Sequence, residues 1–411
     1  MRTIAILGGG IGGIVAANEL RRRIAREHRI VLIERNADHA FAPSFLWLMT
    51  GAREPAQLRR PLTALLRPGI ELVQAEARRL DFSRRKIETG GGEFSYDYLV
   101  VALGAALVPE AVPGLPASAH TFYTFEGAAR LRDAIRDFSR GSIAVVVAAT
   151  PYKCPAAPHE GALLLADHFH RRGLSGSVEV HLLTPEPQPM PVAGPQLGEA
   201  VRNLLAARGV SFHPLHALSS INAEKQELLF QAGQPFRYDL LAIVPPHQGQ
   251  RVLIEAGLTN SAGWVPVNPR TLATGREDVY AIGDATAIPI PGRWKPDTPL
   301  MLPKAGVFAH LQAAVVADRI AAALEGRSPA AEFCGDGSCM LEAGGDLAGF
   351  AFGNFFAQPS PAIELRQVGR AWHLGKVLYE KWWLAPLGLK RDLIGWALKA
   401  GGKFYGIPVT L

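Results

Sequence analysis

The chain of 411 residues has few cysteines: only Cys154, Cys334 and Cys339. A disulfide framework for a chain of this length needs many more, so a cysteine with a role here acts as a reactive group. Charged residues are also sparse, at 19%, against 48% hydrophobic residues, and this balance excludes a disordered chain. The length predicts two α/β domains and a small appendage.

We expect neither a membrane-spanning helix nor an export signal. No run of 18 or more apolar residues occurs, so we expect no helix to span a bilayer. The first strand-like run begins at Thr3 with no charged leader before it, and we therefore expect no secretory signal. No repeat period is visible among the 42 glycines and 31 prolines, which indicates tight backbone sites rather than low complexity.

A dinucleotide-binding pattern occupies residues 3–34. An apolar strand leads into Gly8, Gly10 and Gly13, a helical stretch follows, and a second strand ends at Glu34. The first glycine permits a tight turn, the second lets the backbone approach a pyrophosphate, and the third lets the helix lie close to the strand. Glu34 follows Gly13 by 21 residues, where a carboxylate accepts the ribose hydroxyls. With the strand, helix and acidic residue in place, a bare turn is the weaker interpretation.

The next strand of this kind, residues 143–148, lacks a second glycine fingerprint. Residues 149–160 contain three prolines and no glycine, so side chains keep a pyrophosphate from the backbone, and we expect no nicotinamide cofactor. The loop places Cys154 at the carboxyl end of a parallel strand, where α/β sheets carry chemistry. We expect Lys153 and a helix N-terminus to lower the pKa of its thiol; the alternative is an inert buried cysteine.

Short motifs in a fixed order resemble one flavoprotein family along nearly the whole chain. They lie at 96–105, 151–160, 184–187, 244–247, 279–285, 302–306, 337–339, 355–356 and 376–383. The family is that of the sulfide:quinone oxidoreductases and of the flavoprotein subunits of flavocytochrome c sulfide dehydrogenases. The resemblance implies an α/β fold with two Rossmann-like dinucleotide-binding domains, one for FAD and one without the NAD(P)H fingerprint.

The resemblance also implies a domain organisation. The FAD-binding domain is predicted to be discontinuous, from 1–110 and 255–330, with the second Rossmann-like domain at 111–254. Residues 331–411 are predicted to form a C-terminal region with a redox cysteine, a quinone slot and an amphipathic, membrane-associating helix.

FAD is expected to bind noncovalently, because Pro43 and Ser44 stand where a covalently flavinylated relative has a cysteine. The resemblance places Asp284 on the ribityl chain and Lys304 near the pyrimidine edge, where a cation stabilises the anionic reduced flavin. The residues predicted to bind FAD are Gly8, Gly10, Gly13, Glu34, Arg35, Ser44, Ala77, Ala102, Gly104, Gly283, Asp284, Lys304, Ala305 and Gly306.

By the same resemblance, Cys154 and Cys339 form a redox pair. Sulfide attacks the oxidised bridge and leaves a persulfide, and the Cys339 thiolate passes two electrons to FAD. Glu160 resembles the acidic residue of the family near the sulfur site and is predicted to be a general base; the alternative is a surface carboxylate that caps the following helix. Cys334 matches no family position and is interpreted as a bystander. A further cysteine of the family is missing around 120–123, which leaves the sulfur acceptor open.

The last 50 residues combine positive charge with aromatic side chains. Residues 362–411 hold eight Lys or Arg against three acidic residues, and four of the seven tryptophans. Leu389, Leu393, Trp396 and Ala400 recur at near-helical spacing beside lysines, which predicts an amphipathic helix on an anionic membrane surface. Packing of this helix on its own protein, or a dimer contact, is the alternative.

Phe355, Phe356 and Trp382 are predicted to line the slot for a quinone ring. The predicted function is oxidation of sulfide to polysulfide or sulfur, with two electrons passed through FAD to a quinone. The predicted partners are sulfide, quinone and a membrane surface, with a homo-oligomer left open, and neither nucleic acid nor a metal is expected. The chain is expected to be a peripheral membrane protein. The alternatives are a cytochrome-coupled sulfide dehydrogenase, a type II NADH:quinone oxidoreductase and a flavin-binding redox sensor.

Overall fold

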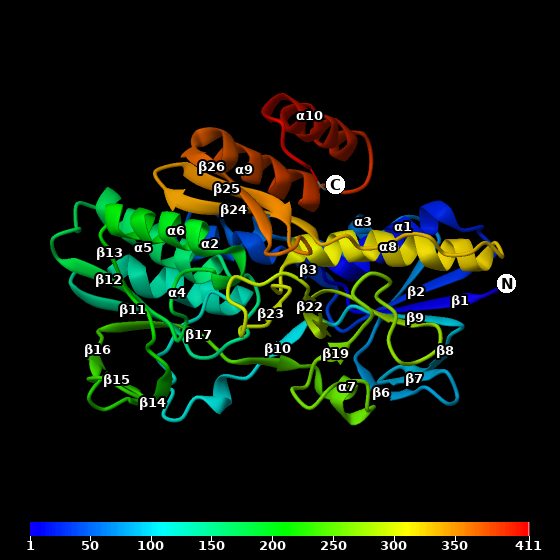
Figure 1. Cartoon of the computed structure of the whole chain (residues 1–411), viewed down its shortest axis with the longest axis horizontal. Helices are drawn as coiled ribbons and strands as arrows, with labels where there is room; N and C mark the ends of the chain where they lie inside the picture. The colour runs from blue at the N-terminus through cyan, green and yellow to red at the C-terminus, as the bar shows by residue number, and fades with distance from the viewer. Residues whose placement is uncertain (410) are drawn as a thin grey trace.

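The computed structural model describes residues 1–409 and 411. Two parallel sheets stand side by side, each covered by helices, and an antiparallel unit from the C-terminal part of the chain lies across both (Figure 1). The arrangement is the α/β fold with two Rossmann-like units that the sequence predicts.

The first sheet has five parallel strands in the order β20-β9-β1-β2-β5. The strands are β1 (Thr3–Leu7), β2 (Arg29–Glu34), β5 (Ile70–Gln74), β9 (Tyr98–Val101) and β20 (Val279–Ala281). Its central strands are apolar because both faces are covered, one by helices and the other by the antiparallel strands β6 (Ala77–Asp81) and β7 (Lys86–Thr89) with α7 (Arg251–Glu255). Helices α1 (Ile11–Arg23) and α8 (Gly306–Leu324) pack against each other beside this sheet. Strand β20 joins the sheet although the whole second sheet precedes it in the sequence.

The second sheet has four parallel strands in the order β13-β12-β11-β17. These are β11 (Gly141–Val147), β12 (Val178–Leu183), β13 (Val210–His213) and β17 (Leu240–Val244). Helices α4 (Phe125–Asp137), α5 (Ala157–Arg171) and α6 (Pro195–Ala207) belong to this unit. The loop between β11 and α5 therefore opens at the carboxyl end of the sheet, beside the first unit. The domain bounds given from the sequence stay a prediction.

Smaller elements connect and flank the two sheets. The short helices are α2 (Phe45–Met49), α3 (Leu62–Leu65) and α7 (Arg251–Glu255). The remaining strands are β3 (Asp38–Ala40), β4 (Arg59–Pro61), β6 (Ala77–Asp81), β7 (Lys86–Thr89), β8 (Gly92–Ser95), β10 (Ala105–Leu107), β14 (Leu218–Asn222), β15 (Glu227–Phe230), β16 (Phe236–Arg237), β18 (His247–Gly249), β19 (Val265–Pro266), β21 (Thr286–Ala287), β22 (Pro289–Ile290) and β23 (Leu300–Met301).

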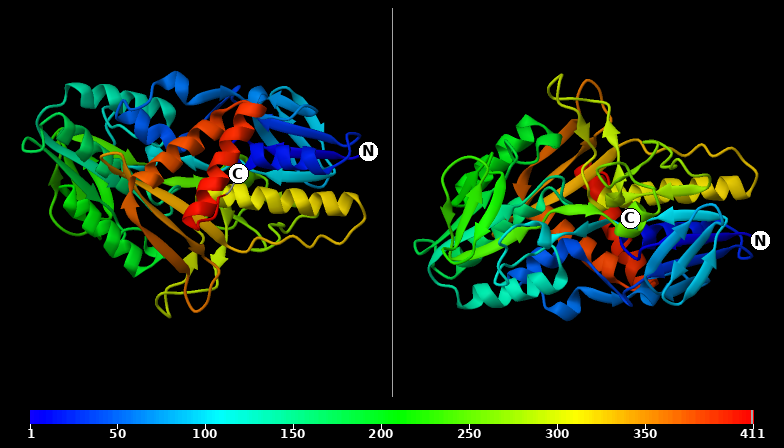
Figure 2. Two further views of the ribbon diagram at one scale, coloured as in Figure 1. Left: turned by 90° about the horizontal axis from the view of Figure 1, so that it is seen from above. Right: turned by 90° about the horizontal axis from the view of Figure 1, so that it is seen from below.

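The C-terminal unit is a three-stranded antiparallel sheet with two helices. It consists of β24 (Asp336–Gly344), β25 (Leu347–Asn354), β26 (Ala362–Gly369), α9 (Arg370–Leu384) and α10 (Leu389–Tyr405). Helix α9 packs on the sheet and α10 packs on α9. Seen from above, α10 lies as the outermost element over the rest of the chain (Figure 2).

Helix α8 bears on the expectation that no helix spans a bilayer. It is 19 residues long and, by length and composition, apolar enough to cross a membrane, although 56% of its most apolar 18-residue segment is buried inside the protein. Polar residues such as Gln312 interrupt its apolar sequence, so the helix contains no unbroken apolar run of 18 residues. Its mean hydropathy nevertheless stays high, at 1.4. The buried Gln312 side chain accepts a hydrogen bond from the Gly283 N–H at 2.7 Å. In this structure α8 is a core helix.

Candidate functional site

A large cavity of about 1960 Å³ runs between the two parallel sheets and under the C-terminal unit. Its wall includes the glycine turn after β1, the loop between β11 and α5, the start of α8, and parts of β24 and α9. Segments from all three predicted regions therefore meet at one site.

The glycine turn forms an open cradle at one end of this cavity. Gly8 has φ +102°, and a Cβ there would lie 2.5 Å from the Ala102 carbonyl oxygen. A Cβ on Gly13 would overlap the Gly8 carbonyl oxygen, so this glycine permits close packing of α1 on β1. Gly10, the N-cap of α1, has no atom within 4 Å of where its Cβ would stand. The space beside the helix N-terminus suits a pyrophosphate.

Glu34 lies at the end of β2 on the wall of the cavity. One carboxylate oxygen accepts from the Gly9 N–H at 2.7 Å, and the other from the Asn36 N–H at 2.9 Å. The Asn36 side chain also donates to the second oxygen, Oε1, at 2.8 Å, so Oε2 keeps the free lone pair for a ribose hydroxyl. Arg35 and Ala77 lie on the same part of the wall.

Two buried oxygens deeper in the cavity lack protein partners. The Ser44 hydroxyl and Asp284 Oδ1 have no hydrogen-bond partner among the described residues. Burial raises the pKa of Asp284. Buried polar atoms are nearly always satisfied, so these two indicate a polar ligand. Together with the glycine cradle and Glu34, they fit a dinucleotide with a polyhydroxylated chain, as FAD is.

Lys304 makes several contacts within the protein, in addition to the position near a flavin that the resemblance implies. Its Nζ donates to the carbonyl oxygens of Asp284 at 2.8 Å and Thr286 at 3.1 Å, and lies 3.4 Å from the centre of the Trp264 ring. Burial lowers the pKa of Lys304 to about 8. The side chain borders the cavity, and its contact with a flavin stays a prediction.

The other residues predicted to bind FAD occupy the same cavity. Ala305 is the N-cap of α8 and Gly306 its first residue, so the N-terminus of a second helix faces the cavity. The wall also carries Ala102, Gly104 and Gly283.

Cys154 is held in place by the main chain. It lies just before α5 with φ +54°, a conformation that non-glycine residues seldom adopt. Its N–H donates to the Lys304 carbonyl oxygen at 2.6 Å, and its own carbonyl oxygen accepts from the Ala157 N–H at 2.9 Å. The Tyr123 hydroxyl also donates to this carbonyl oxygen, at 3.4 Å. The loop that replaces a nucleotide fingerprint is therefore rigid and tied to the start of α8.

Cys339 reaches the same cavity from β24. Both thiols are half-buried and free, and ionisation of Cys154 acts on the pKa of Cys339. The structure thus brings together two cysteines that are far apart in the sequence. Cys334, in contrast, is exposed, and its Sγ lies 3.7 Å from the Glu332 carbonyl oxygen.

The expectation of a lowered thiol pKa is wrong. Burial raises the pKa of Cys154 to about 12, and the negative charge of Glu160 adds to the increase. Lys376 and the Ala157 N–H at the start of α5 act in the lowering direction, but burial outweighs them. Burial lowers the pKa of Lys153 itself, although the negative charges of Asp284 and of an ionised Cys154 act against this effect. Burial also raises the pKa of Cys339.

Glu160 forms a buried ion pair next to the two thiols. Its Oε1 lies 2.5 Å from Lys376 Nζ and accepts from the Glu342 N–H at 2.9 Å. Only 3% of the Glu160 side chain and 10% of the Lys376 side chain are exposed. The alternative of a surface carboxylate is therefore wrong. Lys376 begins the motif at 376–383, but the sequence alone did not indicate its pairing with Glu160, because a single lysine in a helix usually faces solvent.

The three residues predicted to form a quinone slot differ in their position relative to the cavity, and the slot itself stays a prediction. Phe355 lies on the cavity wall. Phe356 instead packs on Phe333, with ring centres 5.4 Å apart, and Trp382 packs on Trp383, with ring centres 5.9 Å apart. The aromatic wall near Lys376 is formed by other side chains, which simple counting of aromatics could not select. They are Phe350, Phe352, Trp372, Tyr379 and Tyr405.

Comparisons with known proteins agree with this geometry. Residues 2–316 match the model of the pyridine nucleotide-disulphide oxidoreductases. The chain is similar to the mitochondrial sulfide:quinone oxidoreductase of Mus musculus, at 26% identity over 87% of this chain and 79% of the relative. It is also similar to the sulfide-quinone reductase of Aquifex aeolicus, at 27% identity over 93% of this chain and 90% of the relative. The crystal structure of the Aquifex aeolicus sulfide:quinone oxidoreductase superposes with a TM-score of 0.83 at 24% identity, over 98% of this chain and 92% of that one. The superposition establishes a shared fold.

Proposed function

Because the chain belongs to the pyridine nucleotide-disulphide oxidoreductase family, we propose that it is an FAD enzyme that oxidises sulfide and reduces a quinone. FAD is the cofactor of this family, and the glycine cradle, Glu34 and the unpaired oxygens of Ser44 and Asp284 fit it. The observation that carries the proposal is the meeting of Cys154 and Cys339 on the wall of the same cavity. The two named relatives support sulfide and quinone as the substrates.

At the sulfur site, the two cysteines begin a turnover as a disulfide. A hydrosulfide ion attacks one sulfur, the S–S bond breaks, and the products are a persulfide on one cysteine and a thiolate on the other. Burial disfavours that thiolate, which makes it a strong electron donor, while the Lys376 ammonium limits the cost of its charge. Bound FAD supplies an isoalloxazine ring that accepts an electron pair from sulfur and donates it to a quinone.

The overall reaction determines what the protein must do with protons. One hydrosulfide ion, one quinone and one proton give one sulfur atom at the oxidation level of the element and one quinol. The buried Glu160–Lys376 pair lines the same cavity as the thiols and the aromatic side chains, and it can hold and transfer this proton there. Phe355 and Tyr379 offer apolar ring faces to a quinone on that wall.

The loop between β11 and α5 argues against an NADH-dependent relative. A type II NADH:quinone oxidoreductase requires a turn that a pyrophosphate can approach, and here the turn carries Tyr152, Cys154 and Pro155 on the cavity wall. For the cytochrome-coupled alternative, we find no feature in its favour among the residues that the structure describes.

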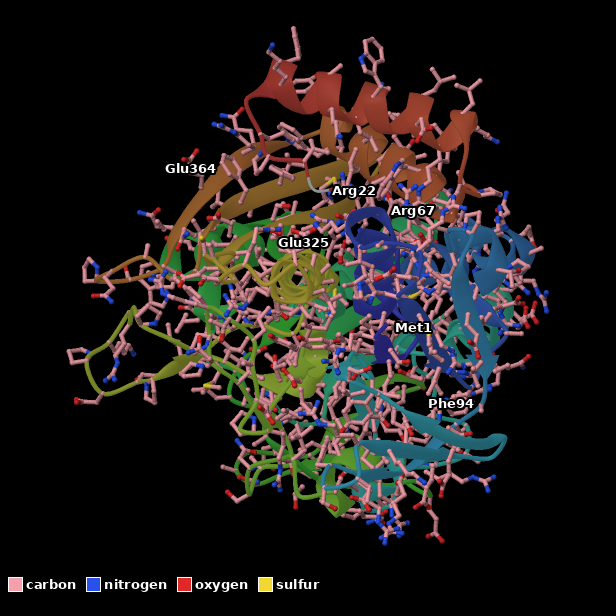
Figure 3. All side chains as sticks on the ribbon, turned by 90° about the vertical axis from the view of Figure 1, so that its right-hand side faces the viewer. Met1, Arg22, Arg67, Phe94, Glu325 and Glu364 are labelled. Atoms are coloured by element: carbon pink, nitrogen blue, oxygen red, sulfur yellow. The ribbon has the colours of Figure 1, made fainter. Side chains whose placement is uncertain are left out.

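We also propose that the protein works at a membrane surface. The exposed face of α10 carries Leu389, Leu393 and Trp396, and Phe404 is exposed near its end. Figure 3 shows this helix at the outer edge of the protein with side chains directed away from the core. Quinones dissolve in lipid, so a quinone reductase with an apolar outer helix is suited to the interface.

The proposal is tested by mixing the flavin-loaded protein anaerobically with sulfide or NADH and following flavin absorbance. Sulfide should bleach the flavin, NADH should not, and a soluble quinone should restore the oxidised spectrum. Bleaching by NADH alone would overturn both the donor assignment and our interpretation of the loop.

A further inference from the structure

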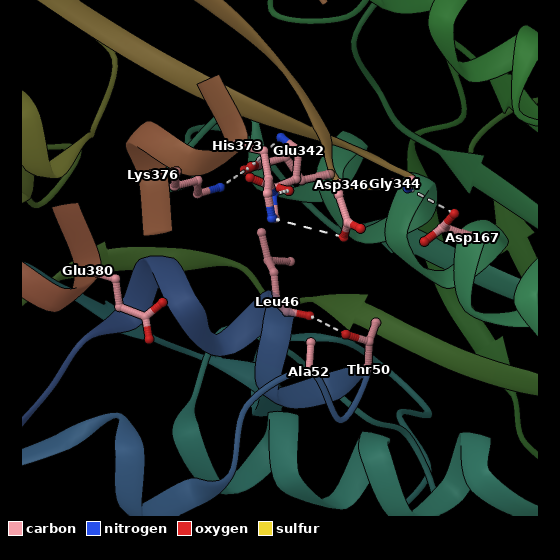
Figure 4. Close-up of polar contacts among 12 residues, drawn as sticks. Leu46, Thr50, Ala52, Asp167, Glu342, Gly344, Asp346, His373, Lys376 and Glu380 are labelled. Atoms are coloured by element: carbon pink, nitrogen blue, oxygen red, sulfur yellow. Dashed lines mark hydrogen bonds and ion pairs between the residues drawn. The ribbon is translucent and has the colours of Figure 1, made fainter. Parts of the chain in front are cut away.

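A line of titratable side chains leads from the buried Glu160–Lys376 pair to the surface (Figure 4). Glu342 Oε2 lies 2.9 Å from His373 Nδ1, and His373 Nε2 lies 4.0 Å from Asp346 Oδ1. The exposed fraction of the side chains rises outward along this line, from 2% at Glu342 through 17% at His373 to 65% at Asp346. The mechanism described under Proposed function assigns no role to these three residues.

Glu342 stands directly beside the buried pair. Its backbone N–H donates to Glu160 Oε1 at 2.9 Å, and the charges of Lys376 and Glu160 both act on its carboxyl group. Its Oε1 is buried and has no hydrogen-bond partner within residues 1–409 and 411. One oxygen of this carboxyl group contacts His373 and the other has no partner, so the second oxygen can carry a proton. Burial raises the pKa of Glu342, which favours the protonated form.

Side chains from several elements enclose this line. Glu342 on β24 faces Glu160 from α5 and both Lys376 and His373 from α9. The Trp47 ring from α2 covers His373, with ring centres 5.9 Å apart, and also lies beneath Lys376. Because this packing shields the pair from solvent, a proton needs a side-chain path to reach it.

We propose that His373 and Glu342 relay protons from solvent at Asp346 to the Glu160–Lys376 pair. The inference rests on the proposed function, in which one proton is taken up for each hydrosulfide ion oxidised. His373 accepts the proton from water at Nε2 and gives up the one on Nδ1 to Glu342 Oε2, and Glu342 passes a proton on to the buried pair. Each transfer breaks one bond to hydrogen and forms one, and no electrons move.

The relay is tested in the flavin-loaded protein by stopped flow in weak buffer with a pH indicator. The protein is first reduced with sulfide and then mixed with a soluble quinone. His373→Gln and Glu342→Gln should slow proton uptake and quinol formation about tenfold or more, while flavin reduction by sulfide stays close to the wild-type rate. His170→Gln is the matched control, because His170 lies on the exposed side of α5 and contacts Ser175.

Chemical rescue separates a relay from a structural contact. Imidazole added to His373→Ala should restore proton uptake, since a small base can occupy the vacated space, whereas lost packing would not respond in this way. An infrared titration adds a readout that does not depend on turnover: the band of a protonated carboxyl should be present in the wild type and lost in Glu342→Gln. If Glu342→Gln fails to fold, His373→Ala with imidazole decides the question.

Wild-type proton uptake in His373→Gln, or failure of imidazole to restore His373→Ala, would overturn the relay. A wild-type protein that sulfide does not reduce would overturn the proposed function instead. The two failures are therefore distinguishable.

Discussion

At the scale of single residues, the site depends on burial more than on nearby charge. A thiol next to a helix N-terminus and a lysine is usually acidic, yet the thiol of Cys154 has a raised pKa because it lies inside the cavity. Lys376 offsets this effect only in part. As a consequence, a cysteine thiolate is scarce in the resting site and forms when sulfide attacks the disulfide.

This environment predicts the pH dependence of alkylation. Since the pKa of Cys154 is raised to about 12, the reactive thiolate is scarce at neutral pH and increases as the pH rises towards that value. In reduced, flavin-loaded Cys334→Ser, Cys339→Ser protein, the rate of reaction with iodoacetamide should still be rising at pH 10. Glutathione, with an ordinary thiol pKa of about 8.5, should already be levelling off. A plateau for the protein near pH 8 would contradict the burial argument.

The buried ion pair predicts a stability effect. Lys376→Met leaves the Glu160 carboxylate buried without its partner, so the free energy of unfolding should fall by about 3–5 kcal/mol. The double variant Lys376→Met, Glu160→Gln removes both charges and should recover much of that loss. Urea unfolding of the three proteins measures the coupling. Equal stability of the single variant and the wild type would show that the pair is not desolvated.

The glycine cradle predicts a change in cofactor content. Gly10→Ala adds a methyl group where the protein itself leaves open space, so the fold should be retained while the purified protein carries less FAD. Gly275→Ala is the matched control, because its Cβ would also meet no atom within 4 Å but lies away from the cavity. Flavin absorbance per protein, with circular dichroism for the fold, measures the effect. Equal flavin in both variants would contradict the assignment of the cradle.

At the scale of elements, α10 shows an unpartnered apolar face. Its residues recur with helical spacing, so the sequence predicts both the helix and the exposed side. Arg391 on its other side is buried, with its guanidinium 4.5 Å from the centre of the Trp382 ring. The helix is thus fixed on α9 by one face while the other stays open.

This arrangement predicts membrane partitioning. Leu393→Ser combined with Trp396→Ser should reduce binding to anionic liposomes, since both side chains are exposed and contribute apolar area. The thermal stability should change little because neither side chain is buried. Leu215→Ser, an exposed leucine in a loop after β13, serves as the control. Unchanged partitioning of the double variant in a flotation assay would exclude α10 as the membrane contact.

At the scale of the whole molecule, chain topology assembles the site. Strand β24 carries Cys339 back to the loop of Cys154, and α9 carries Lys376 to Glu160. The sequence predicted the two sheets, because strand patterns and the glycine fingerprint after β1 depend only on neighbouring residues. The position of Lys376 and the relay from Glu342 depend on how the C-terminal unit packs, which no local pattern encodes.

The same limit applies to the aromatic residues of the predicted quinone slot and to α8. Aromatic content selects a region of the chain, but only packing decides that Phe355 lies on the cavity wall while Phe356 packs on Phe333. Helix α8 has the apolar composition of a membrane span because it is a core helix packed against α1.

The most direct test of the account is sulfide-dependent reduction of a soluble quinone by the purified protein and its three cysteine variants. The wild type and Cys334→Ser should reduce the quinone, whereas Cys154→Ser and Cys339→Ser should lose nearly all of this activity while retaining flavin. Wild-type rates in either Cys154→Ser or Cys339→Ser would contradict the central claim that the disulfide of these two cysteines is what sulfide attacks.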